Sequence, residues 1–237
     1  MNITEKVKEE ALAHAKEDSP RESVGLVHIV KGRERYFPCN NLAETPDEHF
    51  VLDPNDYIKC EEKGQITAVI HSHPVTNHHP SPADLVACEK SGLPWFVVNP
   101  HTEHWGYCEP NGYELPFVGR PFFHGVIDCY TLVQDFYKKE LGIKMGDYFR
   151  RDKWWEKGEN MYLDNFKNEG MREVDLESVQ YGDILLLKLD SVVPNHAALY
   201  LGEMIILHHV QGRLSSRDVY GGYYQKVTEL CLRHESR

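Results

Sequence analysis

The chain has 237 residues, with 41% hydrophobic and 27% charged residues, which is enough for one large or two small packed domains. Its formal net charge of −11 argues against a nucleic acid partner, whose phosphates would repel it. No apolar run approaches the length of about eighteen residues that membrane insertion needs. The first twenty residues lack the apolar core of a signal peptide, so we expect synthesis in the cytoplasm without Sec export by a signal of its own.

Helical and extended patterns alternate over the first hundred residues, which predicts a mixed α+β fold. Asp53, Pro54 and Gly64 have the positions of an N-cap, a first helical residue and a helix end. In chain order we expect a helix over residues 3–17, strands over 24–30, 35–38 and 50–52, a helix over 54–63, a strand over 66–70, a helix over 82–91 and a strand over 95–98.

A pair of histidines ends the buried strand predicted over residues 66–70. His71 and His73 are two residues apart, so an extended chain directs both imidazoles to one face. Ser81 and Pro82 then read as the N-cap and first residue of a helix, which places Asp84 in its first turn. Two imidazoles and a carboxylate are three zinc ligands with a fourth position open, the arrangement that a hydrolytic zinc needs.

A hydrolytic metal site also needs a proton acceptor, and Glu22 at the start of the strand over 24–30 is the best candidate. Glu22, the His71–Pro74 segment, Ser81 and Asp84 together resemble the JAMM metallopeptidase pattern over roughly residues 1–110. The resemblance implies a cytidine-deaminase-like α/β/α domain. It also implies zinc bound by His71, His73 and Asp84, Glu22 as general base, and Ser81 as an oxyanion donor. The alternative is an ordinary strand end beside an ordinary helix cap.

Four more histidines lie near this pattern, and we interpret them as solvated loop residues in preference to extra ligands or substrate contacts. They are His78, His79, His101 and His104. A cluster of proline, glycine and asparagine at residues 109–112 then reads as a linker. We therefore expect two domains, over residues 1–110 and 111–237.

The second domain has its own candidate nucleophile. Asp128 is a good N-cap for a helix that runs to about Leu141 and is closed by Gly142. Cys129 then lies in the first turn, where the helix dipole favours a thiolate. The other cysteines form neither a C-x-x-C pair nor an evident disulfide framework, and Cys60 and Cys88 are expected in the core.

A thiolate nucleophile needs a base, and His196 is the candidate. It begins a strand over 196–202 that turns into a second strand over 205–209. A three-residue turn would place His208 on the same face as His196, whereas a two-residue turn would place His209 there. The residues alone leave both possibilities open.

The Asp-Cys helix start, the His-x-x-x-Tyr-Leu-Gly strand and a further histidine twelve residues on resemble the NlpC-type cysteine peptidases over roughly residues 115–235. The resemblance implies a papain-like core in which Cys129 attacks an amide, His196 is the base, and His208 in preference to His209 orients it. The alternative is a buried free cysteine beside two strand histidines. One departure is Phe122, which stands near the place where this family has a tyrosine that helps to form the oxyanion hole.

The segment 146–175 contains Trp154, Trp155 and Tyr162 among mixed charges. We interpret it as a substrate-binding insertion or a protein interface if the tryptophans are exposed, and as neither if they are buried.

The pairing of these two domains in one chain resembles the tail assembly protein K family of phage lambda and its relatives. The resemblance implies a role in tail assembly and cleavage of peptidoglycan cross-bridge peptides. The implied partners are other tail-tip proteins and a peptidoglycan peptide. The implied location is the host cytoplasm during assembly, then the virion tail tip, which is delivered to the host cell envelope. Two alternatives stay open: a structural tail component with inactive sites, and a cytosolic isopeptidase of deubiquitinating type.

Overall fold

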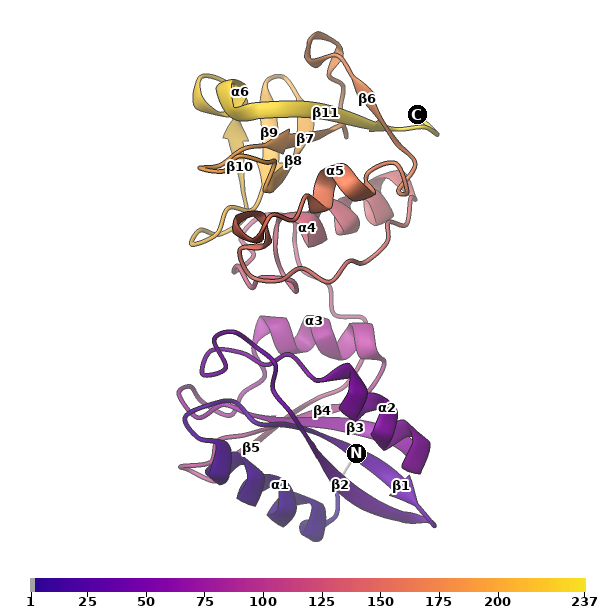
Figure 1. Cartoon of the computed structure of the whole chain (residues 1–237), viewed down its shortest axis with the longest axis vertical. Coiled ribbons are helices and arrows are strands. Elements are labelled where there is room, and N and C mark those ends of the chain that lie inside the picture. Colours follow the sequence, from indigo (N-terminus) through magenta and orange to yellow (C-terminus); the bar gives the residue numbers. More distant parts are fainter. Residues whose placement is uncertain (1–2) are drawn as a thin grey trace. The chain divides into compact units, whose positions relative to one another are not determined.

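The computed structural model describes residues 3–237 and divides into two compact units, the first ending at Glu114 and the second beginning at Leu115. The proposed domain boundary between residues 110 and 111 lies in the coil just before this division. Both units combine helices with a sheet, as the α+β prediction requires (Figure 1). Within the described residues, none of the helices has the length and apolar character of a membrane span.

The first unit is a five-stranded sheet in the order β2-β1-β3-β4-β5, in which only the pair of β3 and β4 is parallel. Its elements are α1 (Glu5–Asp18), β1 (Val24–Val30), β2 (Arg33–Cys39), α2 (Pro54–Lys63), β3 (Gln65–Ser72), α3 (Pro82–Ser91), β4 (Trp95–Val98) and β5 (Trp105–Cys108).

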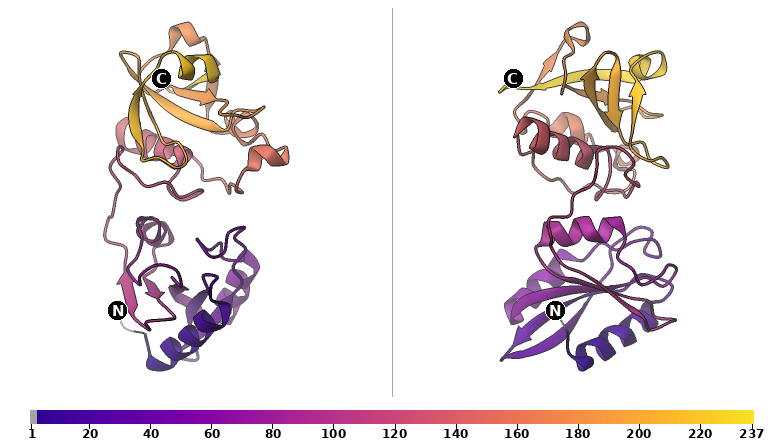
Figure 2. Two further views of the ribbon diagram at one scale, coloured as in Figure 1. Left: turned by 90° about the vertical axis from the view of Figure 1, so that its left-hand side faces the viewer. Right: turned by 180° about the vertical axis from the view of Figure 1, so that it is seen from behind.

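Helices cover both faces of this sheet, because successive strand residues point to opposite sides. The core on one face packs Val7 and Ala11 of α1 against strand residues such as Ile70. The core on the other face contains Cys60 of α2 and Cys88 of α3, as expected for these two cysteines. Figures 1 and 2 show α1 on one side of the sheet and α2 and α3 on the other.

The prediction of a short strand over residues 50–52 is wrong. Only Leu52 forms an isolated bridge, to Asn41. The Asn41 side chain takes up the neighbouring backbone groups instead, because its Oδ1 accepts from the Val51 N–H at 3.0 Å and its Nδ2 donates to the His49 carbonyl at 3.1 Å. Side-chain bonds of this kind replace a regular ladder.

The second unit is a six-stranded antiparallel sheet in the order β10-β9-β8-β7-β11-β6. Its longer elements are α4 (Cys129–Phe136), continued by a π-helical turn (Tyr137–Leu141), α5 (Met161–Asn165), β6 (Met171–Val174), β7 (Ile184–Leu187), β8 (His196–Gly202), β9 (Ile205–His208), β10 (Ser216–Val219), α6 (Tyr223–Val227) and β11 (Thr228–His234). Two short 3-10 helices lie at Trp154–Lys157 and Leu176–Ser178.

The core of this unit lies between α4 and the sheet. Leu132, Val133 and Phe136 of α4 pack against strand residues that include Leu186 and Leu199. The predicted helix over 129–141 therefore exists, with Gly142 closing it in the left-handed region at φ 68°. The packing of α4 on β8 brings the start of this helix to the start of the strand that carries His196.

Candidate active sites

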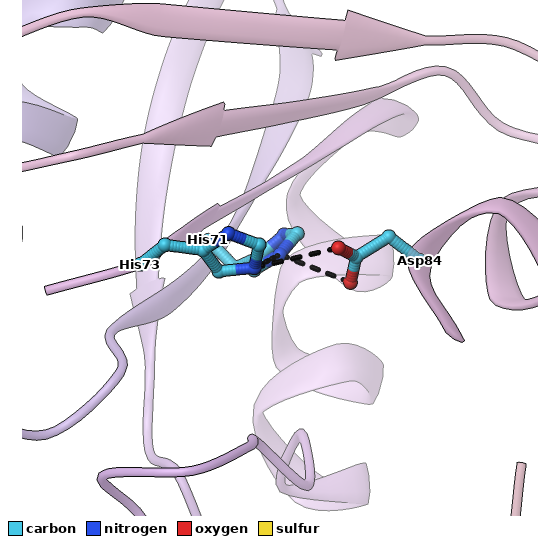
Figure 3. Close-up of side chains that lie close together, drawn as sticks. All are labelled: His71, His73 and Asp84. Carbon is cyan, nitrogen blue, oxygen red and sulfur yellow. Dashed lines mark hydrogen bonds and ion pairs between the residues drawn. The ribbon is translucent and has the colours of Figure 1, made fainter. Parts of the chain in front are cut away.

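The first candidate site lies where β3 ends and α3 begins. Figure 3 shows the imidazoles of His71 and His73 directed at the carboxylate of Asp84. The His71 Nε2 atom lies 3.1 Å from Asp84 Oδ1, and the His73 Nε2 atom lies 3.4 Å from Asp84 Oδ2. The two Nε2 atoms are 3.1 Å apart, and all three residues are buried. In the described part of the chain, these residues form the group of three ligands that could hold a metal ion.

The geometry of this cluster fits a tetrahedral metal. Ligand atoms bound to zinc at about 2.0–2.2 Å stand roughly 3.3 Å from one another, close to the separations seen here. His73 Nδ1 donates to the carbonyl of Asn77 at 2.9 Å, which leaves a lone pair on Nε2 of the neutral ring. The ring of His71 is held by Phe50 and Trp95, at centroid distances of 4.9 Å and 5.5 Å. Both imidazoles are thus oriented before any ion binds.

The predicted helix cap positions Asp84. Asp84 Oδ2 accepts from the Ser81 N–H at 2.6 Å, and Ser81 Oγ accepts from the Asp84 N–H at 3.2 Å, which is a complete capping box. Although burial opposes ionisation, His71 and His73 hold the pKa of Asp84 well below its usual range. In this capping box the Ser81 Oγ is an acceptor, which leaves the hydroxyl hydrogen available to donate. The role of Ser81 as an oxyanion donor stays a prediction.

Glu22 lies beside this cluster, with Oε1 4.0 Å from His73 Nε2. It is only 8% exposed, and this burial raises the pKa of Glu22 to about 7. A carboxylate with such a pKa exchanges protons near neutrality, as a general base must.

Sequence reasoning missed two residues that hold this arrangement. Ser72, between the two histidines, accepts at Oγ from the Ser23 N–H at 2.8 Å and so ties the chain next to Glu22 to the metal strand. Asn99 donates through Nδ2 to the carbonyls of His73 and Thr76, at 2.9 Å and 2.7 Å. The position of Asn99 directly after β4 was a usable signal, because parallel strands β3 and β4 end at the same edge.

The four loop histidines lie outside this group. His79, His101 and His104 are exposed, and His78 is half-buried with its ring near those of His79 and His104. They remain interpreted as loop residues.

The second candidate site begins at the N-terminus of α4. Asp128 is the predicted N-cap, and its Oδ1 accepts from the Thr131 N–H at 2.9 Å. Its other oxygen accepts from Nε of the buried Arg150 at 2.9 Å. Despite the cost of burial, Arg150 holds the pKa of Asp128 below its usual value, so a negative charge persists beside Cys129.

The half-buried side chain of Cys129 lies beside hydrogen-bond donors. Its Sγ lies 3.3 Å from the Tyr162 Oη, and the backbone N–H of Ala197, the residue after His196, is a further neighbouring donor. Burial raises the pKa of the Cys129 thiol, and the Asp128 carboxylate raises it further, whereas the Tyr162 hydroxyl and the Ala197 N–H lower it.

A relay of hydrogen bonds leads from His196 to a carboxylate that sequence reasoning missed. His196 Nε2 lies 3.1 Å from His208 Nδ1, and His208 Nε2 lies 3.0 Å from Asp218 Oδ2 on β10. An ionised carboxylate only accepts, so His208 donates from Nε2 and accepts at Nδ1, and His196 donates from Nε2. This direction leaves Nδ1 of His196 as the basic nitrogen. Burial lowers the pKa of His196 to about 3, which keeps the ring neutral.

The hairpin of β8 and β9 places His208, and not His209, beside His196. It does so through a bulge that the sequence did not indicate. The turn between the strands has two residues, Glu203 and Met204, both at positive φ. The pairing nevertheless shifts by one residue between Tyr200 and Gly202, so Leu201 forms a bulge. Ala198 therefore pairs with His208, and His208 shares the face of His196.

His209 lies elsewhere, with its ring against Phe122 at a centroid distance of 5.0 Å. Within the described residues, neither of its ring nitrogens makes a well-formed hydrogen bond, and burial lowers the pKa of His209 to about 4. Phe122 stands near the place where the NlpC-type peptidases have a tyrosine that helps to form the oxyanion hole. Here its ring packs against a neutral imidazole.

We predict that His209→Leu removes part of the acid sensitivity of the chain. The unfolded histidine titrates near pH 6.5 and the folded one near 4, so the stability that depends on a neutral ring is present above pH 6.5 and is lost as the pH falls below it. Between pH 7.5 and 5, wild type should lose about 2 kcal/mol more unfolding free energy than the variant. Calorimetry at both pH values measures this, with the exposed His101→Leu as control. An equal loss in both proteins would contradict the prediction.

The aromatic segment over residues 146–175 is not the fully exposed insertion that the sequence allowed. Trp154 is only 2% exposed, which speaks against its being an anchor for a partner or substrate, whereas Trp155 is half-buried. Tyr162 instead turns toward Cys129.

Comparison with known proteins identifies one family for each of the two units. The family described as prokaryotic homologs of the JAB domain matches residues 4–107, and the NlpC/P60 family matches residues 119–233. The expected fold class is thereby confirmed: a JAB/MPN-like domain precedes an NlpC/P60 domain. A "Probable TtuB-protein conjugate cleaving protease" of Thermus thermophilus is 34% identical over 82 residues, covering 32% of this chain and 55% of that protein.

Two relatives match most of the chain. The "Tail tip assembly protein K" of Escherichia phage N15 is 39% identical over 229 residues, covering 94% of this chain and 92% of that protein. The protein of the same name from Escherichia phage lambda is 42% identical over 185 residues, covering 78% and 90%. The chain therefore belongs to the tail tip assembly protein K family, as its domain pairing predicted.

Proposed function

We propose that this chain is a tail-tip assembly protein with two hydrolase sites, a zinc-dependent peptidase or isopeptidase and a Cys-His endopeptidase for peptidoglycan peptides. It would meet other tail-tip proteins in the host cytoplasm, enter the virion tail tip and reach the host envelope with it. The family supports the role in tail assembly. The directed hydrogen-bond relay leaves Nδ1 of His196 as the basic nitrogen, on the strand against which the helix of Cys129 packs, and it is the observation that carries the enzymatic part.

At the first site, His71, His73 and Asp84 would hold zinc through Nε2, Nε2 and a carboxylate oxygen. Zinc bound there would lower the pKa of a water to about 7 and polarise a carbonyl. Glu22 would take up the proton, because its buried carboxylate lies beside His73 and has a pKa near neutrality. Ser81 would donate its hydroxyl hydrogen to the developing oxyanion.

At the second site, Cys129 would attack the amide carbonyl and form an acyl-enzyme. His196 would receive the thiol proton at Nδ1 and return it to the leaving amine. His208 would fix the tautomer and orientation of His196, as the third member of such a triad does.

Asp218→Asn should lower kcat at the Cys129 site about tenfold, less than the loss of about 10⁴ when the carboxylate that contacts the base itself becomes an amide. An amide offers both a donor and an acceptor, so it no longer imposes one tautomer on His208. The pH profile of kcat is the measurement, because a purely structural role would not move it. The exposed Asp190→Asn is the matched control, and an unchanged profile for Asp218→Asn would refute this role.

Mass spectrometry of peptidoglycan fragments tests the proposal. Purified sacculi are incubated with wild type, Glu22→Gln, Cys129→Ala and the double variant. Fragments that need Cys129 but not Glu22 identify the bond cut by the second domain, and the converse set identifies the bond cut by the first. Identical fragment patterns from wild type and the double variant would contradict both activities.

A structural role with inactive sites is the second candidate, and Phe122 together with the raised pKa of the Cys129 thiol favours it. Virions assembled with the double variant decide the matter. Full infectivity favours the structural role, whereas normal tails that fail to infect favour the enzymatic one.

An isopeptidase acting on protein conjugates is the third candidate, and the name of the Thermus thermophilus relative favours it. Cleavage of ubiquitin-like conjugates by Cys129→Ala, but not by Glu22→Gln, would support this reading for the first domain.

A further inference from the structure

The side chain of Tyr162 reaches the proposed nucleophile from a distant part of the sequence. Its Oη lies 3.3 Å from Cys129 Sγ, although the two residues are 33 positions apart. Tyr162 belongs to the short helix α5, in the aromatic segment to which the proposed function assigns no role. The contact therefore needs its own explanation.

The ring of Tyr162 is held by apolar packing. Its centroid lies 5.7 Å from that of Trp154 and 6.2 Å from that of Tyr130, both in edge-on geometry. It also packs against the core beneath α4 and lines a small apolar cavity of about 40 Å³ beside Ala197. Since these contacts fix the ring, the direction of the hydroxyl toward the sulfur is a property of the fold.

The chemistry of the pair favours donation from oxygen to sulfur. Burial raises the pKa of Tyr162 well above its usual value, so its hydroxyl stays protonated and is a lasting donor. The half-buried sulfur is partly desolvated and lies beside the ionised Asp128, and both effects disfavour a thiolate. A hydrogen bond to the charged form offsets that penalty. Phe122 has no hydroxyl to supply one.

We propose that Tyr162 is a further catalytic residue of the Cys129 site, whose hydroxyl stabilises first the thiolate and then the oxygen of the substrate carbonyl. This inference rests on the proposed cysteine peptidase function. The thiol proton passes to His196 Nδ1, the bond from sulfur to the carbonyl carbon forms, and the carbonyl electron pair moves to oxygen, toward which the Tyr162 hydroxyl turns. The C–N bond then breaks, His196 protonates the leaving amine, and water hydrolyses the thioester to restore the thiol.

Alkylation of Cys129 by iodoacetamide tests the first half without any substrate. In Tyr162→Phe, which keeps the ring, the pH midpoint of alkylation should rise by about one unit, and the rate at neutral pH should fall about tenfold. Tyr148→Phe is the matched control, because Tyr148 lines the same cavity and its hydroxyl donates to Glu169. It should alkylate as wild type does.

Turnover of peptidoglycan peptides tests the second half. Tyr162→Phe should lower kcat by about 10²–10³ with little change in KM, the usual effect of losing one oxyanion donor. Counting alkylated cysteines by mass spectrometry reports folding, since an unfolded chain exposes all six. If Tyr162→Phe unfolds, Tyr162→Met, whose smaller flexible side chain adapts to the apolar site and also lacks the hydroxyl, is judged by the same two measurements.

An alkylation profile and a kcat equal to those of wild type would overturn the inference. Faster alkylation of Tyr162→Phe would overturn it too, because the hydroxyl would then shield the sulfur. Full activity of Cys129→Ala would instead refute the proposed function, and this outcome is separate from the alkylation result.

Discussion

Cys129→Ala is expected to abolish cleavage of peptidoglycan peptides by the second domain, with a fall in kcat of at least about 10⁴-fold. A methyl group cannot form the acyl-enzyme, and removal of the nucleophile from such a triad costs up to about 10⁶-fold. The substitution should leave the bound zinc unchanged, because the metal cluster belongs to the other compact unit. Chromatography of the released muropeptides gives the rate, and elemental analysis gives the metal.

Cys231→Ala is the matched control for this experiment. Cys231 is a buried cysteine of the same unit and lies on β11, away from α4. It should retain wild-type activity. Digestion at the wild-type rate by Cys129→Ala would remove the assignment of a nucleophile to this domain.

The second large effect is expected for His71→Ala. Wild type should bind about one zinc ion per chain, and the variant less than about a tenth of that, because two remaining ligands do not make a stable site. A bound metal stabilises the folded state by mass action, at roughly 4 kcal/mol when it is present at a thousand times its dissociation constant. A chelator should therefore lower the melting temperature of wild type and leave that of His71→Ala nearly unchanged.

His104→Ala is a suitable control for the metal site. His104 lies in the same unit but is exposed and outside the cluster of three ligands. It should bind zinc as wild type does. Retention of a full equivalent of zinc by His71→Ala would show that the ion is held elsewhere.

Local signals in the sequence predicted the parts of each site that are set within a few residues. His71 and His73 share a face because a strand alternates, and Asp84 lies where a capping box holds it. Asp128 places Cys129 at a helix start in the same way. These features depend on neighbours in the chain, which is why they could be anticipated.

Asp218 and Tyr162 were not assigned to the second site from the sequence, because their contacts depend on the tertiary fold. Asp218 reaches His208 only because β10 pairs with β9, and Tyr162 reaches Cys129 only because its ring packs into the core beneath α4. The strand expected over residues 50–52 failed for a related reason, since the side chain of Asn41, ten residues away, accepts from the Val51 N–H. No periodicity encodes such long-range contacts.

Because of the bulge at Leu201, the residue that lies beside His196 depends on the number of residues in the hairpin more than on which side chains the hairpin carries. Successive side chains of a strand point to opposite faces of the sheet. Losing or gaining a single residue between Tyr200 and His208 would therefore place a different side chain beside His196 instead of His208. Evolution of this hairpin should therefore tolerate many substitutions in the turn but few changes in its length. Genomes of related phages offer a natural record in which that constraint can be sought.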